Sequence, residues 1–180
     1  MRVSDEPASR LPVVLVGPMG AGKSTVGALL ADALGLAARD TDADIEAGAG
    51  QSVADIFVTE GEARFRELER IAVAAALTGH DGVLSLGGGA VLDPRTQDAL
   101  AEHRAAGGVV VFLRVGLSDA VQRVGLGSTR PLLLGNVRGR IKALLDERTP
   151  IYESVASHVV DTDGRAAEDV ATEIQELITR

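Results

Sequence analysis

Short apolar runs alternate with stretches of helical periodicity along most of the chain. The apolar runs at residues 13–16, 83–86, 109–113 and 159–160 predict buried strands, and a weaker run at 36–39 predicts a strand that ends before Asp40. Apolar residues recur at helical spacing in residues 23–34, 60–77, 94–105, 137–152 and 166–178. Such alternation predicts an α/β fold in which helices cover both faces of a parallel sheet.

A glycine-rich turn joins the first predicted strand to the first predicted helix. Residues 17–25 have the sequence GPMGAGKST, which matches G-x-x-x-x-G-K-[ST]. Glycines allow such a loop to fold with its N–H groups pointing inward, and the helix N-terminus adds positive potential for a polyphosphate. Lys23 can then reach the β- and γ-phosphates, and Ser24 can offer its hydroxyl to Mg²⁺. The alternative is a glycine-rich turn that binds no ligand.

Two carboxylates, Asp40 and Asp42, follow the weak second strand. Ligands bind at this end of the strands in open α/β sheets. Residues i and i+2 of an extended segment share a face, so both side chains are expected to face the phosphate loop. Asp40 would hold Mg²⁺ through its water shell, and Asp42 would accept a proton or hydrogen bond from a hydroxyl nucleophile. Alternatively, either residue only caps the following helix.

Three consecutive glycines, Gly87, Gly88 and Gly89, follow the third predicted strand at the same sheet edge. Glycines at this place allow a substrate to contact bare backbone with exposed N–H donors. A tight turn is the alternative interpretation.

Arginines supply the remaining candidates for binding anions. Arg130 lies in a loop flanked by glycines, and an arginine in such a loop can close over a transferring phosphoryl group. Arg66 and Arg148 lie in predicted helices, and an arginine in a pocket can bind a carboxylate through two parallel hydrogen bonds. The alternatives are an ordinary surface ion pair between Arg66 and Glu69, which are i, i+3 partners, and a solvated side chain for each of the others.

Composition restricts the class of protein. The 180 residues, 46% hydrophobic and 24% charged, fit one globular domain. A formal charge of −8 argues against general attraction to nucleic acid or anionic membranes, so an anionic ligand needs a local basic cluster. The absence of cysteine excludes disulfides, thiolate metal sites and a cysteine nucleophile.

The ends of the chain and its apolar runs bear on location. No apolar run reaches the roughly 18 residues of a membrane span, and residues 1–10 lack the apolar segment of a signal peptide. We therefore expect a short mobile tail at 1–10, a single domain at 11–180 and a cytoplasmic protein.

In combination, these motifs resemble the shikimate kinase family over nearly the whole chain, from about Leu11 to the C-terminus. The matching segments are, in order, GPMGAGKST, Asp40-Thr41-Asp42, SVADIF, GEARFRELE, LGGGAV, RPLL and ERTPIYESVA. The phosphate loop alone is generic. The ordered combination is specific, because neighbouring P-loop kinases do not combine Asp-x-Asp, Phe-Arg, Gly-Gly-Gly and Arg-Pro-Leu-Leu.

The resemblance implies an adenylate-kinase-like P-loop fold with a five-stranded parallel sheet, a substrate-binding region at 41–70 and a lid at 123–136. The implied reaction transfers the γ-phosphoryl group of ATP, with Mg²⁺ as cofactor, to the 3-hydroxyl of shikimate on the route to chorismate and aromatic amino acids. The expected partners are ATP and shikimate, without nucleic acid or membrane, and the expected state is a monomer. The alternatives are a kinase for another small hydroxy acid such as gluconate, and a nucleotide-binding regulatory module without catalysis.

The resemblance also assigns residues to roles. The implied catalytic residues are Lys23, Asp42 and Arg130, and the implied metal ligands are Ser24 and Asp40. The implied ATP-binding residues are Gly20, Ala21, Gly22, Lys23, Ser24, Thr25, Arg123, Arg130 and Arg165. The implied substrate-binding residues are Asp42, Phe57, Phe65, Arg66, Gly87, Gly88, Gly89 and Arg148. Arg165 departs from the family pattern, because the family often has its basic residue one place earlier, where this chain has Gly164.

Overall fold

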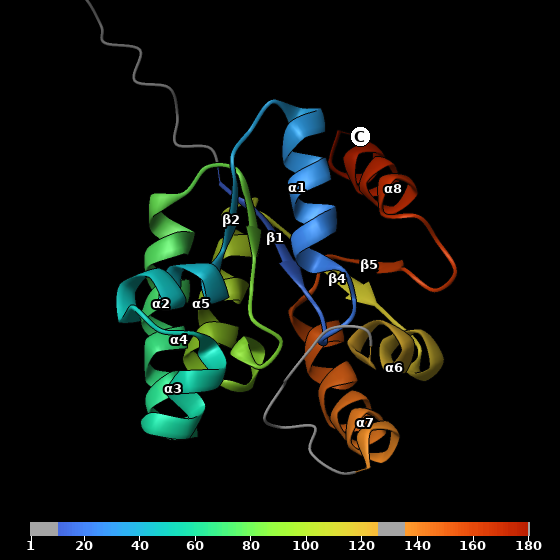
Figure 1. Cartoon of the computed structure of the whole chain (residues 1–180). Coiled ribbons are helices and arrows are strands. Elements are labelled where there is room, and N and C mark those ends of the chain that lie inside the picture. The colour runs from blue at the N-terminus through green and yellow to red at the C-terminus, as the bar shows by residue number, and fades with distance from the viewer. Residues whose placement is uncertain (1–10, 126–135, 180) are drawn as a thin grey trace, which may run out of the picture.

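The protein forms a three-layer α/β domain with a five-stranded parallel sheet in the middle (Figure 1). The computed structural model describes residues 11–125 and 136–179, so the expected N-terminal tail, most of the expected lid and Arg130 lie outside the described residues. The strands are β1 (Val13–Val16), β2 (Ala38–Asp40), β3 (Val83–Ser85), β4 (Val109–Arg114) and β5 (His158–Asp161). Their order is β2-β3-β1-β4-β5, and every neighbouring pair is parallel. The predicted fold class is confirmed.

Helices follow the strands in the predicted alternation. They are α1 (Lys23–Leu34), α2 (Thr41–Ala49), α3 (Val53–Thr59), α4 (Glu62–Gly79), α5 (Pro94–Ala105), α6 (Leu117–Gly125), α7 (Val137–Val155) and α8 (Ala167–Thr179), with a 3₁₀ turn η1 (Ala90–Leu92). The apolar periodicity predicts the exact bounds of α1 and α5 and comes within a few residues for α4, α7 and α8. It does not predict α2, α3 and α6, which contain nine, seven and nine residues. Helices this short contain too few apolar positions to establish a helical period.

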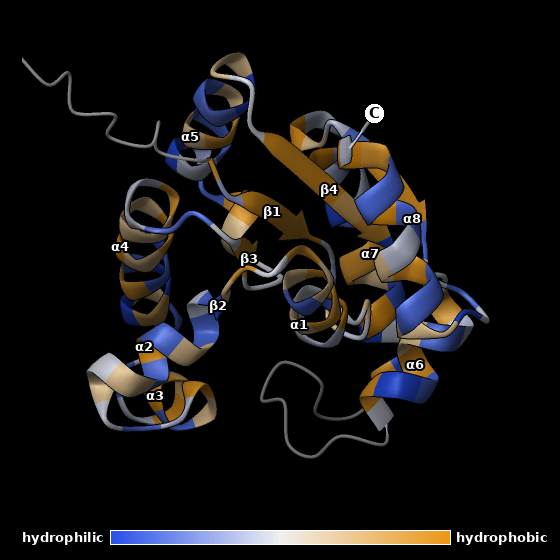
Figure 2. Ribbon diagram, turned by 90° about the horizontal axis from the view of Figure 1, so that it is seen from above, coloured by the Kyte–Doolittle hydropathy of each residue, from blue (hydrophilic) through white to orange (hydrophobic). Residues whose placement is uncertain are grey.

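The two faces of the sheet form two separate parts of the core. Side chains alternate along a strand, so in β1 Leu15 faces one side and Val14 and Val16 face the other. Helices α1, α6 and α8 contribute to the Leu15 side, and α4 and α5 contribute to the opposite side. Strand β1 and residues 109–113 of β4 are apolar and lie between these helices (Figure 2).

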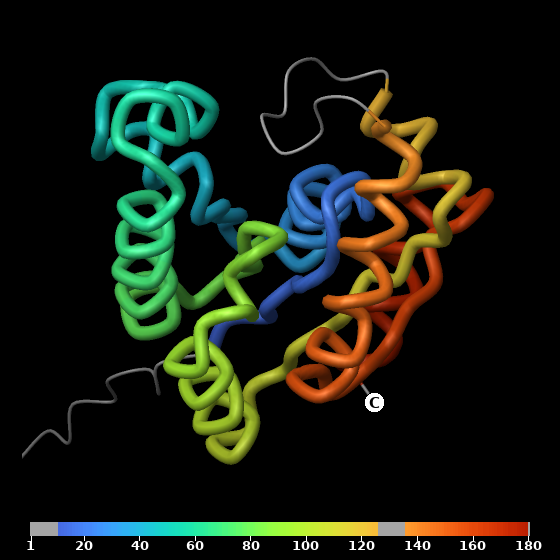
Figure 3. Tube along the Cα trace, turned by 90° about the horizontal axis from the view of Figure 1, so that it is seen from below, coloured from blue at the N-terminus to red at the C-terminus, as the bar shows by residue number. Residues whose placement is uncertain are grey.

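A third, smaller cluster lies away from the sheet. Ile45 of α2, Ile56 of α3 and Phe65 of α4 are buried against one another, and Phe57 packs at their edge. This α2–α4 cluster attaches α2 and α3 to α4. Figure 3 shows these helices on one side of the carboxyl end of β1 and α6 on the other side. No helix of the described residues is long and apolar enough to span a bilayer.

The buried His103 of α5 gives a prediction for stability. Burial lowers its pKa from the ordinary 6.5, and the Pro12 and Val109 carbonyls only partly oppose the shift. Below pH 6.5, His103 therefore binds a proton more readily in the unfolded chain than in the folded protein. We expect neutral, buried His103 to contribute fully to the free energy of unfolding above pH 6.5. This contribution should decline as the pH falls from 6.5 through the lowered pKa of the folded state.

Urea denaturation of the wild type and of His103→Gln at about pH 8 and about pH 5.5 would check this. The wild type should lose more free energy of unfolding on acidification than the variant does. Equal losses in the two proteins would contradict the assignment to His103.

Candidate active site

The phosphate loop occupies the turn between β1 and α1. Gly22 precedes the helix, and no side chain caps the N-terminus of α1, the end of a helix that favours an anion. The Lys23 ammonium donates hydrogen bonds to the carbonyl oxygens of Gly17 at 2.7 Å and Pro18 at 3.0 Å. These contacts hold the lysine across the loop.

Asp40 connects the phosphate loop to α2. Its Oδ2 accepts a hydrogen bond from the Ser24 hydroxyl at 2.6 Å, and its Oδ1 accepts one from the Asp42 amide at 2.9 Å. Asp40 is therefore the N-cap of α2 as well as a neighbour of Ser24. The prediction that Asp40 and Asp42 share one extended segment is wrong, because α2 begins at Thr41. Asp42 instead lies in the first turn of α2, where it lines the same cleft as Asp40.

The oxygen donors beside the loop fit a magnesium ion. Among the described residues, no group of three or more His, Cys, Asp or Glu side chains is arranged to hold a metal. Mg²⁺ prefers oxygen ligands and is commonly bound by one or two protein groups together with substrate phosphates. The Ser24 hydroxyl and the Asp40 carboxylate, 2.6 Å apart, provide two such groups.

The glycine loop after β3 faces the first turn of α2. The buried Thr41 hydroxyl accepts a hydrogen bond from the Gly87 amide at 3.1 Å, which ties the two segments together. A Cβ at Gly87 would lie 2.7 Å from Asp42 Oδ1, so only glycine allows this approach. Within the described part of the chain, the amides of Gly88 and Gly89 have no hydrogen-bond partner. Both residues line the cleft, where these amides are available to a ligand.

Arg66 approaches the same loop from α4. Its guanidinium is held by Glu69 at 2.7 Å and Glu62 at 3.2 Å. A Cβ at Gly89 would clash with this guanidinium, so a side chain there would displace Arg66 from its present position. The pair with Glu69 is not a surface ion pair, because the Glu69 side chain is only 4% exposed.

Glu69 is a site residue that the sequence analysis misses. Burial raises its pKa, as does the nearby Asp42 carboxylate, and these effects outweigh the opposing influence of Arg66 and Arg148. Its Oε1 has no hydrogen-bond partner among the described residues. A signal exists in the sequence: the buried stripe of α4 consists of Phe65, Glu69, Val73 and Ala76, so Glu69 occupies an apolar position of the helical period.

Arg148 reaches the cleft from α7 on the opposite side. It is 6% exposed and belongs to the buried stripe of its helix. Its Nε has no hydrogen-bond partner in the described residues. A buried guanidinium without its full complement of acceptors favours an anionic ligand.

These groups line one cleft of about 550 Å³. Its lining includes most residues predicted for the phosphate loop, the metal and the acceptor: Gly20, Gly22, Lys23, Ser24, Thr25, Asp40, Asp42, Phe57, Phe65, Arg66, Gly88, Gly89 and Arg148. Lining residues without a predicted role include Met19, Glu46, Ser52, Val53, Ala54, Glu69 and Leu86. Gly87 is beside the cleft and not in its lining.

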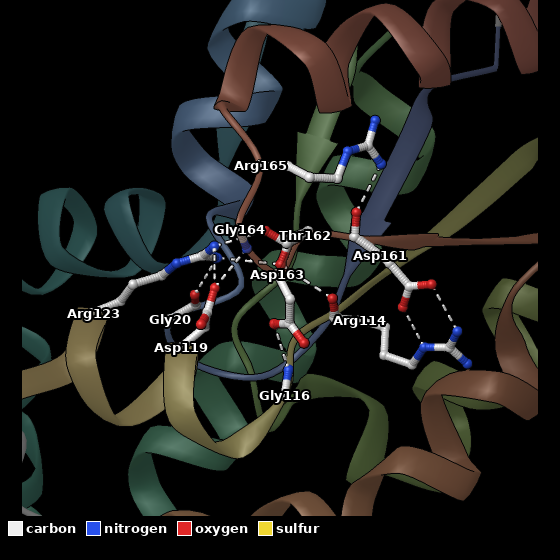
Figure 4. A network of polar contacts seen from close by, with 10 residues as sticks. All are labelled: Gly20, Arg114, Gly116, Asp119, Arg123, Asp161, Thr162, Asp163, Gly164 and Arg165. Atoms are coloured by element: carbon white, nitrogen blue, oxygen red, sulfur yellow. Dashed lines mark hydrogen bonds and ion pairs between the residues drawn. The ribbon is translucent and has the colours of Figure 1, made fainter.

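Arg123 and Arg165 lie in a second hollow of about 200 Å³, beside Ala21, Gly22, Thr25 and Val170. Arg123 donates hydrogen bonds to the carbonyl oxygens of Gly20 at 3.1 Å and Thr162 at 2.7 Å, as Figure 4 shows. Arg165 instead binds the Asp161 carbonyl at 2.9 Å and the Glu173 carboxylate at 2.6 Å. Its guanidinium is therefore already engaged by β5 and α8.

The fold and the cleft define a P-loop kinase with a site for a small anionic acceptor beside the phosphate loop. The family model described as shikimate kinase matches residues 19–179. A shikimate kinase of Salinispora arenicola is 55% identical over 165 residues, which cover 92% of this chain and 96% of that protein. The chain belongs to the shikimate kinase family.

Solved structures agree with this assignment. A shikimate kinase from Acinetobacter baumannii in complex with shikimate is 36% identical, with a TM-score of 0.89, covering 95% of this chain and 94% of that one. A gluconokinase from Sinorhizobium meliloti is 21% identical, with a TM-score of 0.54, over 95% and 94% of the two chains. The second similarity reflects the fold alone.

Proposed function

We propose that this chain transfers the γ-phosphoryl group of ATP to the 3-hydroxyl of shikimate, forming shikimate 3-phosphate and ADP. The observation that carries the proposal is the single cleft in which the phosphate loop, Asp42, the Gly88 and Gly89 amides and two arginines meet. Family membership and the similarity to a shikimate complex support the same acceptor.

The nucleotide is assigned to the phosphate loop and to the second hollow. The amides at the start of α1 would bind phosphate oxygens, and Lys23 would exchange its carbonyl partners for the β- and γ-phosphates. Ala21 and Arg123 border the hollow beside the loop, which suits the adenine side of ATP. Arg165 would contribute its aliphatic stem there, because its guanidinium is bound elsewhere. Arg130 and the lid expected at 123–136 remain predictions on the phosphate side.

The acceptor is assigned to the opposite part of the cleft, the region predicted at 41–70 together with the glycine loop and α7. Arg66 and Arg148 approach from different helices and would bind the shikimate carboxylate. The Gly88 and Gly89 amides would donate hydrogen bonds to its oxygens, and Phe57 and Phe65, whose ring centroids are 4.8 Å apart, would shape the wall. Glu69 would hold Arg66 in place.

In the chemical step, the 3-hydroxyl oxygen forms a bond to the γ-phosphorus while the bond from that phosphorus to the β–γ bridging oxygen breaks. Asp42 would orient the hydroxyl and accept its proton. Lys23 and the α1 amides would stabilise the charge that develops on the phosphoryl oxygens. Ser24 and Asp40 would hold Mg²⁺, which supplies charge neutralisation on the phosphates when bound.

A coupled assay of ADP release with shikimate, gluconate and quinate side by side tests the proposal. We expect turnover with shikimate to exceed turnover with the other two by a wide margin. Arg66 and Arg148 alone do not exclude gluconate, which is also a carboxylate. Equal turnover with all three acceptors, or none with shikimate, would contradict the proposed activity.

A further inference from the structure

The single tyrosine of the chain, Tyr152, lies against the glycine loop. It belongs to α7, it is 0% exposed, and its ring stacks on Phe112 with centroids 5.0 Å apart and planes inclined by 25°. The ring is therefore part of the apolar core under the sheet. The hydroxyl is its one polar group, and it donates a hydrogen bond to the carbonyl oxygen of Gly88. A buried tyrosine hydroxyl normally requires such a partner.

The carbonyl groups of the glycine loop have three different partners. Gly87 O accepts a hydrogen bond from Ala90 N and Gly89 O accepts one from Leu92 N, both at 3.0 Å within the η1 turn. Gly88 O accepts from Tyr152. The two outer carbonyls are thus fixed by local backbone, whereas the central one is fixed by a side chain 64 residues away.

This central contact determines where the next amide points. The C=O of Gly88 and the N–H of Gly89 belong to one planar peptide unit, and in a trans peptide they point in opposite directions. Tyr152 holds the carbonyl toward the core, so the Gly89 N–H is directed away from the core, and Gly89 lines the cleft. Glycines without side chains do not constrain this peptide by themselves, because they populate both signs of φ.

The same hydroxyl also lies next to Arg148, one helical turn earlier on α7. Burial raises the pKa of Tyr152 to about 12, although the positive charge of Arg148 acts in the opposite direction. The hydroxyl therefore remains a hydrogen-bond donor throughout the working pH range. The contact that the hydroxyl makes in the structure is the one with the Gly88 carbonyl, in a peptide that lines the cleft.

We infer that Tyr152 is a positioning residue of the acceptor site: its hydroxyl fixes the Gly88–Gly89 peptide with the Gly89 N–H directed into the cleft. The inference rests on the proposed function, since it assigns this amide to the acceptor. Tyr152 lines neither the cleft nor the second hollow, so it would act on the acceptor through the Gly88–Gly89 peptide.

The Tyr152→Phe variant tests the inference by removing one oxygen and keeping the stacked ring. We expect the shikimate KM to rise about tenfold, the scale of one lost buried hydrogen bond, while the ATP KM stays within about twofold. Val155→Ala is the matched control, because Val155 lies one turn further on α7 in the same part of the core. That variant should lower the melting temperature and leave both KM values unchanged.

A shikimate KM of Tyr152→Phe equal to that of the wild type, or an equal rise in both KM values, would overturn the inference. Absence of shikimate turnover by the wild-type protein would instead contradict the proposed function itself. The two failures are therefore distinguishable in the same assay.

A second measurement does not depend on how well the variant folds. Because the chain contains one tyrosine, incorporation of 3-fluorotyrosine gives a ¹⁹F resonance from position 152 alone. We expect saturating shikimate to shift this resonance in the otherwise unchanged protein, and gluconate at equal concentration to leave it in place. A resonance that does not respond to bound shikimate would overturn the inference.

Discussion

Replacement of Asp42 by Asn is expected to lower kcat by roughly 10² to 10⁴. Asn is nearly isosteric with Asp and can still orient a hydroxyl, but it cannot take up the proton that the acceptor must lose. The N-cap of α2 is Asp40, so the substitution leaves the start of the helix intact. Steady-state ADP release at saturating shikimate and ATP would measure the effect, with a melting curve to check the fold.

The matched control for this variant is Asp44→Asn. Asp44 lies in the same first turn of α2, pairs with Arg39 at 2.7 Å and does not line the cleft. It should retain kcat within about twofold, because this partly exposed ion pair lies outside the cleft. A near-wild-type kcat for Asp42→Asn would show that Asp42 does not act on the proton.

Replacement of Arg148 by Lys is expected to lower kcat/KM for shikimate by about 10²-fold, mainly through KM, with little change in the KM for ATP. The lysine keeps the charge but loses the planar pair of donors that binds a carboxylate. Because Arg148 is 6% exposed, the lost hydrogen bonds cannot be replaced freely by water. Arg66→Lys should have the same sign and a smaller effect, because Arg66 is partly exposed.

Arg138→Lys provides the comparison on the same helix, since Arg138 is exposed and does not line the cleft. It should leave both KM values unchanged. If Arg66→Lys and Arg148→Lys both retain the wild-type KM for shikimate, the two arginines have structural roles and do not bind the acceptor.

The sequence predicts the sheet and the phosphate loop well, because both depend on local patterns. The β-branched run before GPMGAGKST and the helical period after it place the loop without knowledge of the rest of the chain. Helix α2 is less predictable, because it contains small and acidic residues and buries only Thr41 and Ile45. Its position comes from tertiary contacts, such as the Thr41 hydroxyl on the Gly87 amide.

The acceptor side shows where sequence reasoning fails for physical reasons. The spacing of Arg66 and Glu69 fits a surface pair equally well, and only the packing of α4 shows that Glu69 is buried. The role inferred for Tyr152 depends on a contact between segments 64 residues apart. Such a contact has no signature in either segment alone.

The α2–α4 cluster has a consequence for how the enzyme responds to heat. Ile45, Ile56 and Phe65 form a core much smaller than that on either face of the sheet, so α2 and α3 can detach while the β1–α1 unit stays folded. Warming should therefore abolish acceptor binding before nucleotide binding, and leave an enzyme that still holds ATP but cannot use it. Shikimate would delay this inactivation more than ATP, because it would connect the loosely held helices to the glycine loop and to α7.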